Sequence, residues 1–178
     1  MSFFLPVEAI VEGVAEFVSE PQQLPAGFGA TGPLARSLFL MGWIEEQTLI
    51  ARLKGKGVAI ITGCGHPTIE LIVKMVKSLC HEPIYAIVGG LHFPVTGSPL
   101  KKSGIQSTDD LGHGEAALAA DNRCGFDRTV SFLRKVVPQK LLLSAHDSCD
   151  HALSRISDEL QCDTRILKAG ETYDLQGG

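Results

Sequence analysis

Between residues 57 and 167 the sequence alternates between short apolar runs and segments with helical periodicity, which restricts the possible folds more than any other feature. Short apolar runs bounded by glycine indicate buried strands, and apolar residues three and four positions apart indicate helices that cover them. Strands that alternate with helices form a largely parallel sheet with right-handed connections. We therefore predict an α/β fold with a mixed sheet and flanking helices.

The boundaries of the expected elements follow from these patterns. A hairpin is expected where two apolar stretches, residues 47–54 and 58–62, meet at Gly55-Lys56-Gly57. The other expected strands are residues 84–88, residues 140–144 and one or two strands within residues 164–175, and the expected helices are residues 68–79, 126–136 and 150–160.

The remaining segments are less regular. Residues 7–18 place apolar side chains on one helical face, although Gly13 leaves a short helix followed by a strand at 14–19 equally open. Residues 20–37 are rich in proline and glycine, which is typical of loops and turns. Residues 94–125 are rich in glycine, serine and aspartate and are expected to form a long insertion. We expect residues 1–178 to form one domain.

Composition excludes several classes of function. The chain is 44% hydrophobic and 20% charged, which suits a folded core. Its net charge of -4 and its lack of a basic stripe argue against a nucleic-acid partner. No apolar run reaches the length needed to span a membrane, so no membrane partner is expected. Five cysteines at irregular spacing predict a reduced, cytoplasmic protein rather than a disulfide framework.

Three of the predicted strands end in a histidine, at His66, His92 and His146. Because ligands gather at the carboxyl ends of parallel strands, these imidazoles could converge on a metal ion. Cys64 and Asp147 add a thiol and a carboxylate beside two of them, and zinc suits nitrogen and sulfur ligands. His66, His92 and His146, with Cys64 and Asp147, are therefore candidate metal ligands.

The same residues allow other interpretations. A single histidine at the end of a strand is usually a hydrogen-bonding loop residue, and Cys64 behind an apolar strand resembles a small buried filler. The pairs Cys64/His66 and His146/Cys149 could also form a closed structural zinc site, although such sites normally lie on loops. Glycines such as Gly89 and Gly90 serve either tight turns or the close approach of the backbone to a ligand.

Four runs of the sequence together resemble the metallo-β-lactamase superfamily. The most similar branch contains the dihydropterin ribofuranosylaminobenzene-phosphate synthase-like hydrolases, which show a G-C-[SG]-H-P turn, a G-G-[FL]-H turn and a late strand ending in H-C-T-G. The third motif departs from this pattern, since the sequence reads His146-Asp147-Ser148-Cys149. The matching runs are TLIARLKGKGVAIITGCGHPTIELI, AIVGGLHFP, LLLSAHDSCDHALSRI and ILKAGETYDL, and upstream Gly29–Gly32 and Glu45-Glu46-Gln47 resemble the branch's tG-x-[IP] and D-D-Q-[AT]-L segments.

The first metal motif of that superfamily, H-x-H-x-D-H, is absent from this sequence, because no two of its six histidines are separated by a single residue. The resemblance therefore implies the C-terminal half of an αββα sandwich, a single partial domain. It further implies that Cys64 and His66 end the strand that carries a metal-facing loop and that His146 matches the late histidine ligand. On this resemblance His66 and His146 are the main expected metal ligands, and Cys64 and Asp147 are further candidates. His92 is expected to be a ligand or to orient a substrate, and Gly89 and Gly90 are implied to line the substrate site with it.

The resemblance also implies a function. The expected activity is that of a metal-dependent hydrolase or transferase that uses a divalent ion, zinc or manganese, on a small-molecule phosphoester or related substrate. Without the first motif the isolated chain is expected to be inactive, unless another chain or a longer gene product supplies the missing ligands. The alternatives are a non-catalytic domain that binds a metal or a small anion, and an assembly module.

The expected helices also bear on association. They cover only one side of the sheet, and alternate residues of the strands face the other side. An uncovered apolar face of that size is unusual in a soluble monomer. We expect either a homodimer through this face or residues 1–50 folded across it, and a two-fold dimer is the commoner solution.

Overall fold

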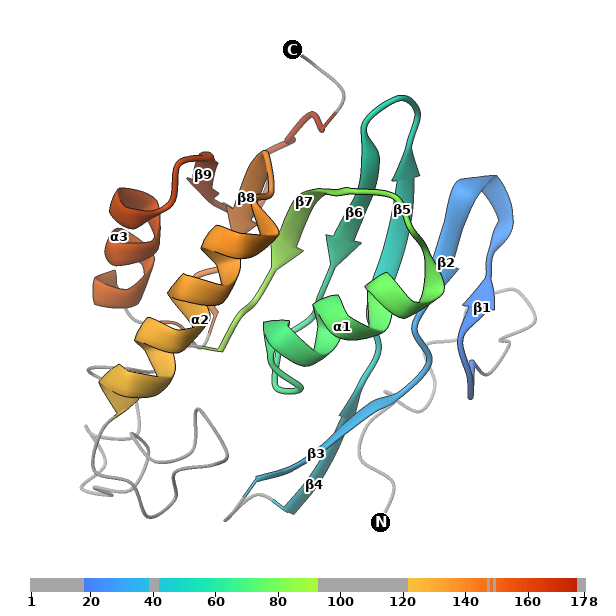
Figure 1. Cartoon of the computed structure of the whole chain (residues 1–178), viewed down its shortest axis with the longest axis horizontal. Helices are drawn as coiled ribbons and strands as arrows, with labels where there is room; N and C mark the ends of the chain where they lie inside the picture. The colour runs from blue at the N-terminus through green and yellow to red at the C-terminus, as the bar shows by residue number, and fades with distance from the viewer. Residues whose placement is uncertain (1–17, 39–41, 93–121, 147, 149, 176–178) are drawn as a thin grey trace.

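The computed structural model describes residues 18–38, 42–92, 122–146, 148 and 150–175 of the chain (Figure 1). Within these residues the chain forms a seven-stranded mixed sheet and flanking helices, as the sequence predicts, and also a separate two-stranded ribbon that was not expected. The strands are β1 (Gln22–Gln23), β2 (Phe28–Ala30), β3 (Leu34–Leu38), β4 (Gly42–Glu46), β5 (Leu49–Leu53), β6 (Gly57–Ile61), β7 (Ile84–Gly89), β8 (Lys140–Leu143) and β9 (Asp163–Ile166), and the helices are α1 (Ile69–Leu79), α2 (Asn122–Val136) and α3 (Asp150–Glu159).

The large sheet has the strand order β1-β2-β5-β6-β7-β8-β9. Strands β6 to β9 are parallel, because α1, α2 and α3 each carry the chain back before the next strand begins. Strands β1, β2, β5 and β6 pair antiparallel. Strands β3 and β4 form the ribbon, which Figure 1 shows extending away from the large sheet below α1.

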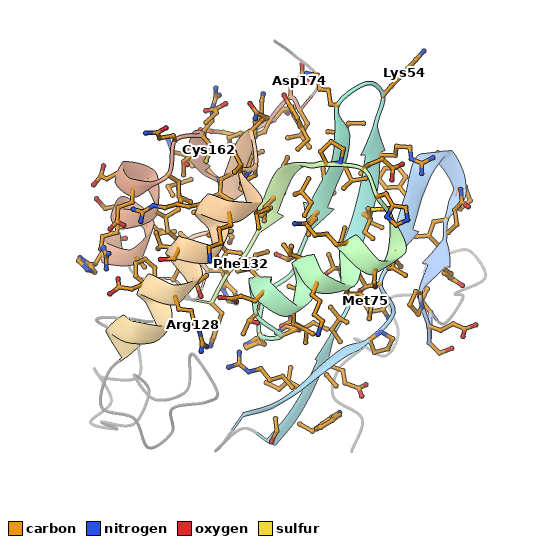
Figure 2. The ribbon with its side chains drawn as sticks, in the orientation of Figure 1. Lys54, Met75, Arg128, Phe132, Cys162 and Asp174 are labelled. Carbon is orange, nitrogen blue, oxygen red and sulfur yellow. The ribbon has the colours of Figure 1, made fainter. Side chains whose placement is uncertain are left out.

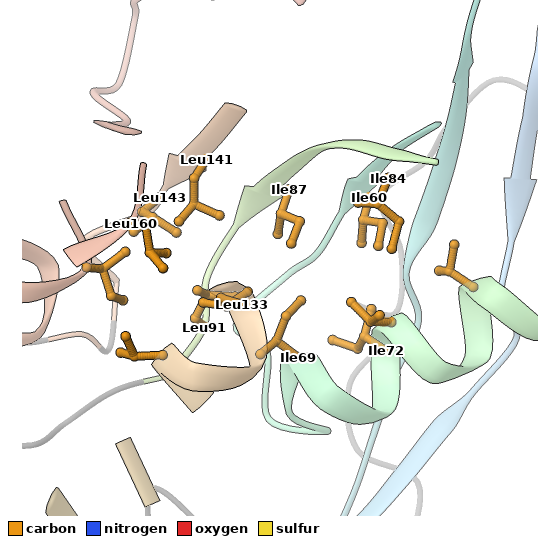
Figure 3. Packing of buried hydrophobic residues seen from close by; sticks show 14 of the residues in the cluster. Ile60, Ile69, Ile72, Ile84, Ile87, Leu91, Leu133, Leu141, Leu143 and Leu160 are labelled. Atoms are coloured by element: carbon orange, nitrogen blue, oxygen red, sulfur yellow. The ribbon is translucent and has the colours of Figure 1, made fainter. Parts of the chain in front are cut away.

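Helix α1 shows how the sequence produces this packing. It begins after Thr68, whose side chain accepts a hydrogen bond from the backbone N–H of Leu71 and so caps the helix. Its apolar side chains at three- and four-residue spacing, such as Ile69 and Ile72, are buried against the sheet (Figure 3). Burying a side chain of this size contributes about 1.5–3 kcal/mol, so this face fixes the helix to the strands.

All three helices pack on the same face of the sheet (Figures 1 and 2). The core between helices and sheet includes Ile60 of β6, Ile87 of β7 and Leu141 of β8, with Leu133 of α2 and Ile156 of α3 on the other side. No described helix is both long enough and apolar enough to cross a lipid bilayer.

The opposite side of the sheet, here called the back face, is also apolar. Ala51, Ala59 and Ala86 lie in register across β5, β6 and β7, and Leu175 of the C-terminal segment packs near them. The back face includes Leu49, Ala51, Leu53, Ala59, Ile61, Ala86, Val88 and Leu142, which are buried or half-buried rather than fully exposed.

Two sequence expectations require correction. Residues 20–37 are not loop alone, since β1, β2 and most of β3 lie there. Pro25 and Pro33 occupy the connections between these short strands, and Pro21 precedes β1. Helix α2 begins at Asn122, inside the expected insertion. The expected elements at residues 7–18 and the rest of the insertion lie largely or wholly outside the described residues.

Two glycine turns, which follow β6 and β7, pack backbone against backbone. Gly90 N–H donates to Gly63 O at 2.8 Å, and the Thr62 hydroxyl donates to Gly90 O at 2.9 Å. A Cβ on Gly65 would lie only 2.4 Å from Gly90 O, and Gly65 has a φ of +83°. The turns therefore approach more closely than any side chain at Gly65 would permit.

This contact predicts that Gly65→Ala destabilises the protein far more than Gly55→Ala. Gly55 has a similar φ of +74° but open space around its Cα, so its substitution carries only the cost of the left-handed conformation, about 1 kcal/mol. Gly65→Ala adds a steric clash, which we expect to raise the loss to about 3 kcal/mol. Urea unfolding of both variants measures the difference, and equal losses would show that the turns are not in tight contact.

Candidate metal centre

Three potential metal ligands converge at the carboxyl end of β6. Cys64 and His66 belong to the turn that follows this strand, and Glu46 is the last residue of β4 in the ribbon. Their ligand atoms all lie within 4.8 Å of one another, and each side chain is half-buried. The ribbon thus brings Glu46 close to two residues that lie 18 and 20 positions further along the chain.

The Glu46 carboxylate is the centre of the hydrogen bonding in this cluster. Its Oε2 atom accepts a hydrogen bond from Gly65 N–H at 3.0 Å, and its Oε1 atom contacts Nδ1 of His66. The two side chains are only 18% and 13% exposed, so water screens their interaction weakly. The contact therefore fixes both the carboxylate and the imidazole ring.

The environment of Glu46 also affects its ionisation. Burial by itself raises the pKa of the Glu46 carboxyl, but the hydrogen bond and the charge of His66, with the N–H groups of Gly65 and His66, act in the other direction and prevail. The pKa is consequently lower than the ordinary value for glutamate, because these donors stabilise the ionised form. Glu46 is therefore a carboxylate at neutral pH.

The ribbon contributes a second contact to the same turn. Arg36 of β3 donates from Nη1 to the carbonyl oxygen of His66 at 2.8 Å. In the ribbon Leu34 pairs with Glu46 and Arg36 with Ile44, so these four residues lie on the same face. Leu34 on this face is buried. The ribbon thus holds the His66 backbone through Arg36 and the His66 ring through Glu46.

His92, predicted as a ligand or substrate-orienting group, does lie beside this cluster. It is a buried residue, its ring centroid is 4.4 Å from that of His66, and the two rings are tilted by 46°. Its φ of +50° is uncommon for a residue with a side chain. Such strain is often found at functional sites, where the surrounding structure maintains it.

Gly89 and Gly90, predicted to bind substrate, have a structural reason to be glycine. A Cβ on Gly89 would lie 2.2 Å from Thr62 O, and one on Gly90 would lie 2.7 Å from Cys64 O. Both residues are thus required by the contact between the two turns. Their role in substrate binding stays a prediction.

His146 lies outside the cluster of Glu46, Cys64 and His66. It follows β8, it is exposed, and its N–H donates to the Ser144 hydroxyl at 3.1 Å. Its role as a metal ligand stays a prediction, as does that of Asp147, which lies outside the described residues together with Cys149. The closed structural zinc site includes Cys149 and therefore also stays a prediction.

Glu46 was not among the ligands predicted from the sequence. The available signal was the segment Glu45-Glu46-Gln47, which resembles the D-D-Q segment of the related branch. A carboxylate, a thiolate and an imidazole together fit zinc or a similar divalent ion. The same three groups also occur in sites with a nucleophilic cysteine.

No family model and no curated protein sequence matches this chain. Among solved structures, its fold is similar to that of Tm1679, a metal-dependent hydrolase of the β-lactamase superfamily, with a TM-score of 0.58 and 20% sequence identity. The similarity covers 90% of this chain but only 58% of Tm1679, so the chain spans less than two thirds of that protein's length. The chain therefore shares its α/β fold with part of a β-lactamase-superfamily hydrolase.

Proposed function

We propose that this chain forms the C-terminal half of a metal-dependent hydrolase or transferase of the metallo-β-lactamase type, most similar to the dihydropterin ribofuranosylaminobenzene-phosphate synthase-like branch. The observation that carries the proposal is the convergence of Glu46, Cys64 and His66 at the end of β6. The similarity to the fold of Tm1679 supports metal chemistry over nucleophilic cysteine chemistry at this position.

The proposed cofactor is a divalent ion, with zinc favoured over manganese because Cys64 offers a thiolate. When bound, such an ion lowers the pKa of a coordinated water and polarises a phosphoryl or acyl group. Cys64 and His66 would hold it, His146 is the proposed late ligand, and His92 would orient a small-molecule phosphoester or related substrate beside the His66 ring. Glu46 and Arg36 keep the turn in place.

The missing H-x-H-x-D-H motif favours a second candidate function, a non-catalytic domain that binds a metal or a small anion. In the catalytic alternative, another chain or a longer gene product supplies that motif. We propose a cytoplasmic location, because five cysteines at irregular spacing suit a reducing compartment.

The proposed site predicts weak zinc binding. Tight catalytic zinc sites use at least three protein ligands. In the described cluster only Cys64 and His66 are proposed to hold the ion, and His146 is exposed and lies outside it, so calorimetric titration of zinc should give an affinity no tighter than micromolar. His66→Ala and His146→Ala should each weaken binding by about tenfold or more.

The matched control is His81→Ala, which removes an exposed imidazole outside the cluster and should leave the affinity unchanged. Zinc binding that persists unaltered in both His66→Ala and His146→Ala would remove the site assignment.

The missing motif predicts that the isolated chain hydrolyses phosphodiester, phosphomonoester and lactam substrates poorly or not at all. A metal with too few ligands is not held in the position needed to activate water. Steady-state assays with zinc or manganese test this expectation. Efficient turnover that a chelator abolishes would contradict it, because a complete site would then exist without H-x-H-x-D-H.

We further propose that a second copy of the chain covers the back face. The helices occupy only the other face, and the half-buried side chains of Leu49, Ile61 and Val88 leave apolar surface there for a second sheet. Sedimentation equilibrium at micromolar concentration should therefore show a dimer. Ile61→Glu on the back face should shift it to monomer, whereas Leu79→Glu on the exposed side of α1 should not. A wild-type monomer would reject the dimer.

A further inference from the structure

The contact between Glu46 and His66 determines which ring nitrogen faces away from the ribbon. Glu46 Oε1 contacts Nδ1 of His66, while Oε2 accepts the N–H of Gly65 at 3.0 Å. Both carboxylate oxygens are thus engaged within the turn that carries His66. An ionised carboxylate has no proton to donate, so the proton in its contact with Nδ1 must belong to the imidazole.

A neutral imidazole has only one N–H group. If that proton is on Nδ1 and is directed at Glu46, then Nε2 carries a lone pair and is the ring atom able to bind a metal. Histidine ligands commonly have this arrangement, with the other ring nitrogen held by a carboxylate. The same geometry makes Glu46 a poor first ligand, because its oxygens already accept two hydrogen bonds.

We propose that Glu46 is a positioning residue that fixes His66 with its proton on Nδ1 and leaves Nε2 as the metal-binding atom, rather than a metal ligand itself. This inference rests on the proposed metal function for its biological meaning, but the tautomer of His66 is a property of the metal-free chain.

Two further contacts restrict the ring and support this assignment. Arg36 holds the carbonyl oxygen of His66 at 2.8 Å, and the His92 ring lies 4.4 Å from the His66 ring, centroid to centroid. The backbone carbonyl, the Nδ1 atom and the ring of His66 are therefore all in contact with neighbours. The ribbon supplies two of these contacts, from Arg36 on β3 and Glu46 on β4.

The test is a long-range ¹H–¹⁵N correlation spectrum of the full chain, metal-free and labelled in its histidines, at a pH of about 8.5, where an ordinary histidine is neutral. The ring signals of His66 are those present in the wild-type spectrum and missing from the spectrum of His66→Ala. We expect the wild-type ring to be protonated at Nδ1 only. A proton on Nε2 in the wild type would overturn the proposal, and this readout requires no variant of Glu46.

Glu46→Gln provides a sharper comparison. In this variant the glutamine amide oxygen replaces Oε2 as the acceptor for Gly65 N–H, so the amide NH₂ group faces Nδ1 of His66. Because an NH₂ group can only donate, Nδ1 should become the acceptor and the ring proton should move to Nε2. Glu45→Gln is the matched control, since Glu45 is exposed and accepts from the Trp43 indole N–H instead. Its His66 signals should equal those of the wild type. Unchanged His66 signals in Glu46→Gln would contradict the proposal.

A cobalt titration separates this inference from the proposed function. Cobalt(II) bound by Cys64 gives a sulfur charge-transfer band, and its visible spectrum reports the number of ligands. Glu46→Gln should weaken cobalt binding by about 10–100-fold while the spectrum at saturation stays the same. A changed saturated spectrum would identify Glu46 as a ligand and overturn the inference. No cobalt binding by the wild type would reject the metal function, and the tautomer measurement would still decide the role of Glu46.

Discussion

The contact between the turns that follow β6 and β7 is the constraint on which the site depends. Gly63 and Gly90 are joined by a backbone hydrogen bond of 2.8 Å, and the Thr62 hydroxyl holds the Gly90 carbonyl at 2.9 Å. Because backbone packs on backbone, the position of each turn is determined without any flexible side chain between them. For this reason His66, on the first turn, and His92, on the second, lie next to each other, and their rings come into contact.

The parallel half of the fold could be predicted from the sequence because its signals are local. Ile69, Ile72 and Val76 repeat at helical spacing and are all buried, so periodicity alone identifies α1 and the face that it buries. The apolar run that ends at Ile61 identifies β6 in the same way. The histidines at the strand ends indicated the edge of the sheet where a site would form, since chain order fixes that edge in a parallel sheet.

The ribbon and the role of Glu46 could not be predicted in this way. Strands β3 and β4 pair with each other rather than with the large sheet, and residues such as Ser37 and Glu45 give them no regular apolar pattern. Glu46 reaches His66 only because the ribbon folds back toward a turn 20 residues away in sequence. Such a contact depends on tertiary structure, and only the D-D-Q resemblance pointed to this segment. His146 is the opposite case: its position at the end of a strand is visible in the sequence, but the structure does not place it in the cluster of Glu46, Cys64 and His66.

The ribbon has one further consequence. Its described strands form no ladder with the large sheet, so side chains such as Arg36 and Glu46 connect it to the turn after β6. If the ribbon leaves this turn, the His66 ring loses the contact with Glu46 that orients it. By thermodynamic linkage, anything that binds the oriented ring also strengthens docking of the ribbon by the same factor, and anything that pulls the ribbon away weakens that binding equally. The ribbon is, in this sense, an intramolecular effector of the site.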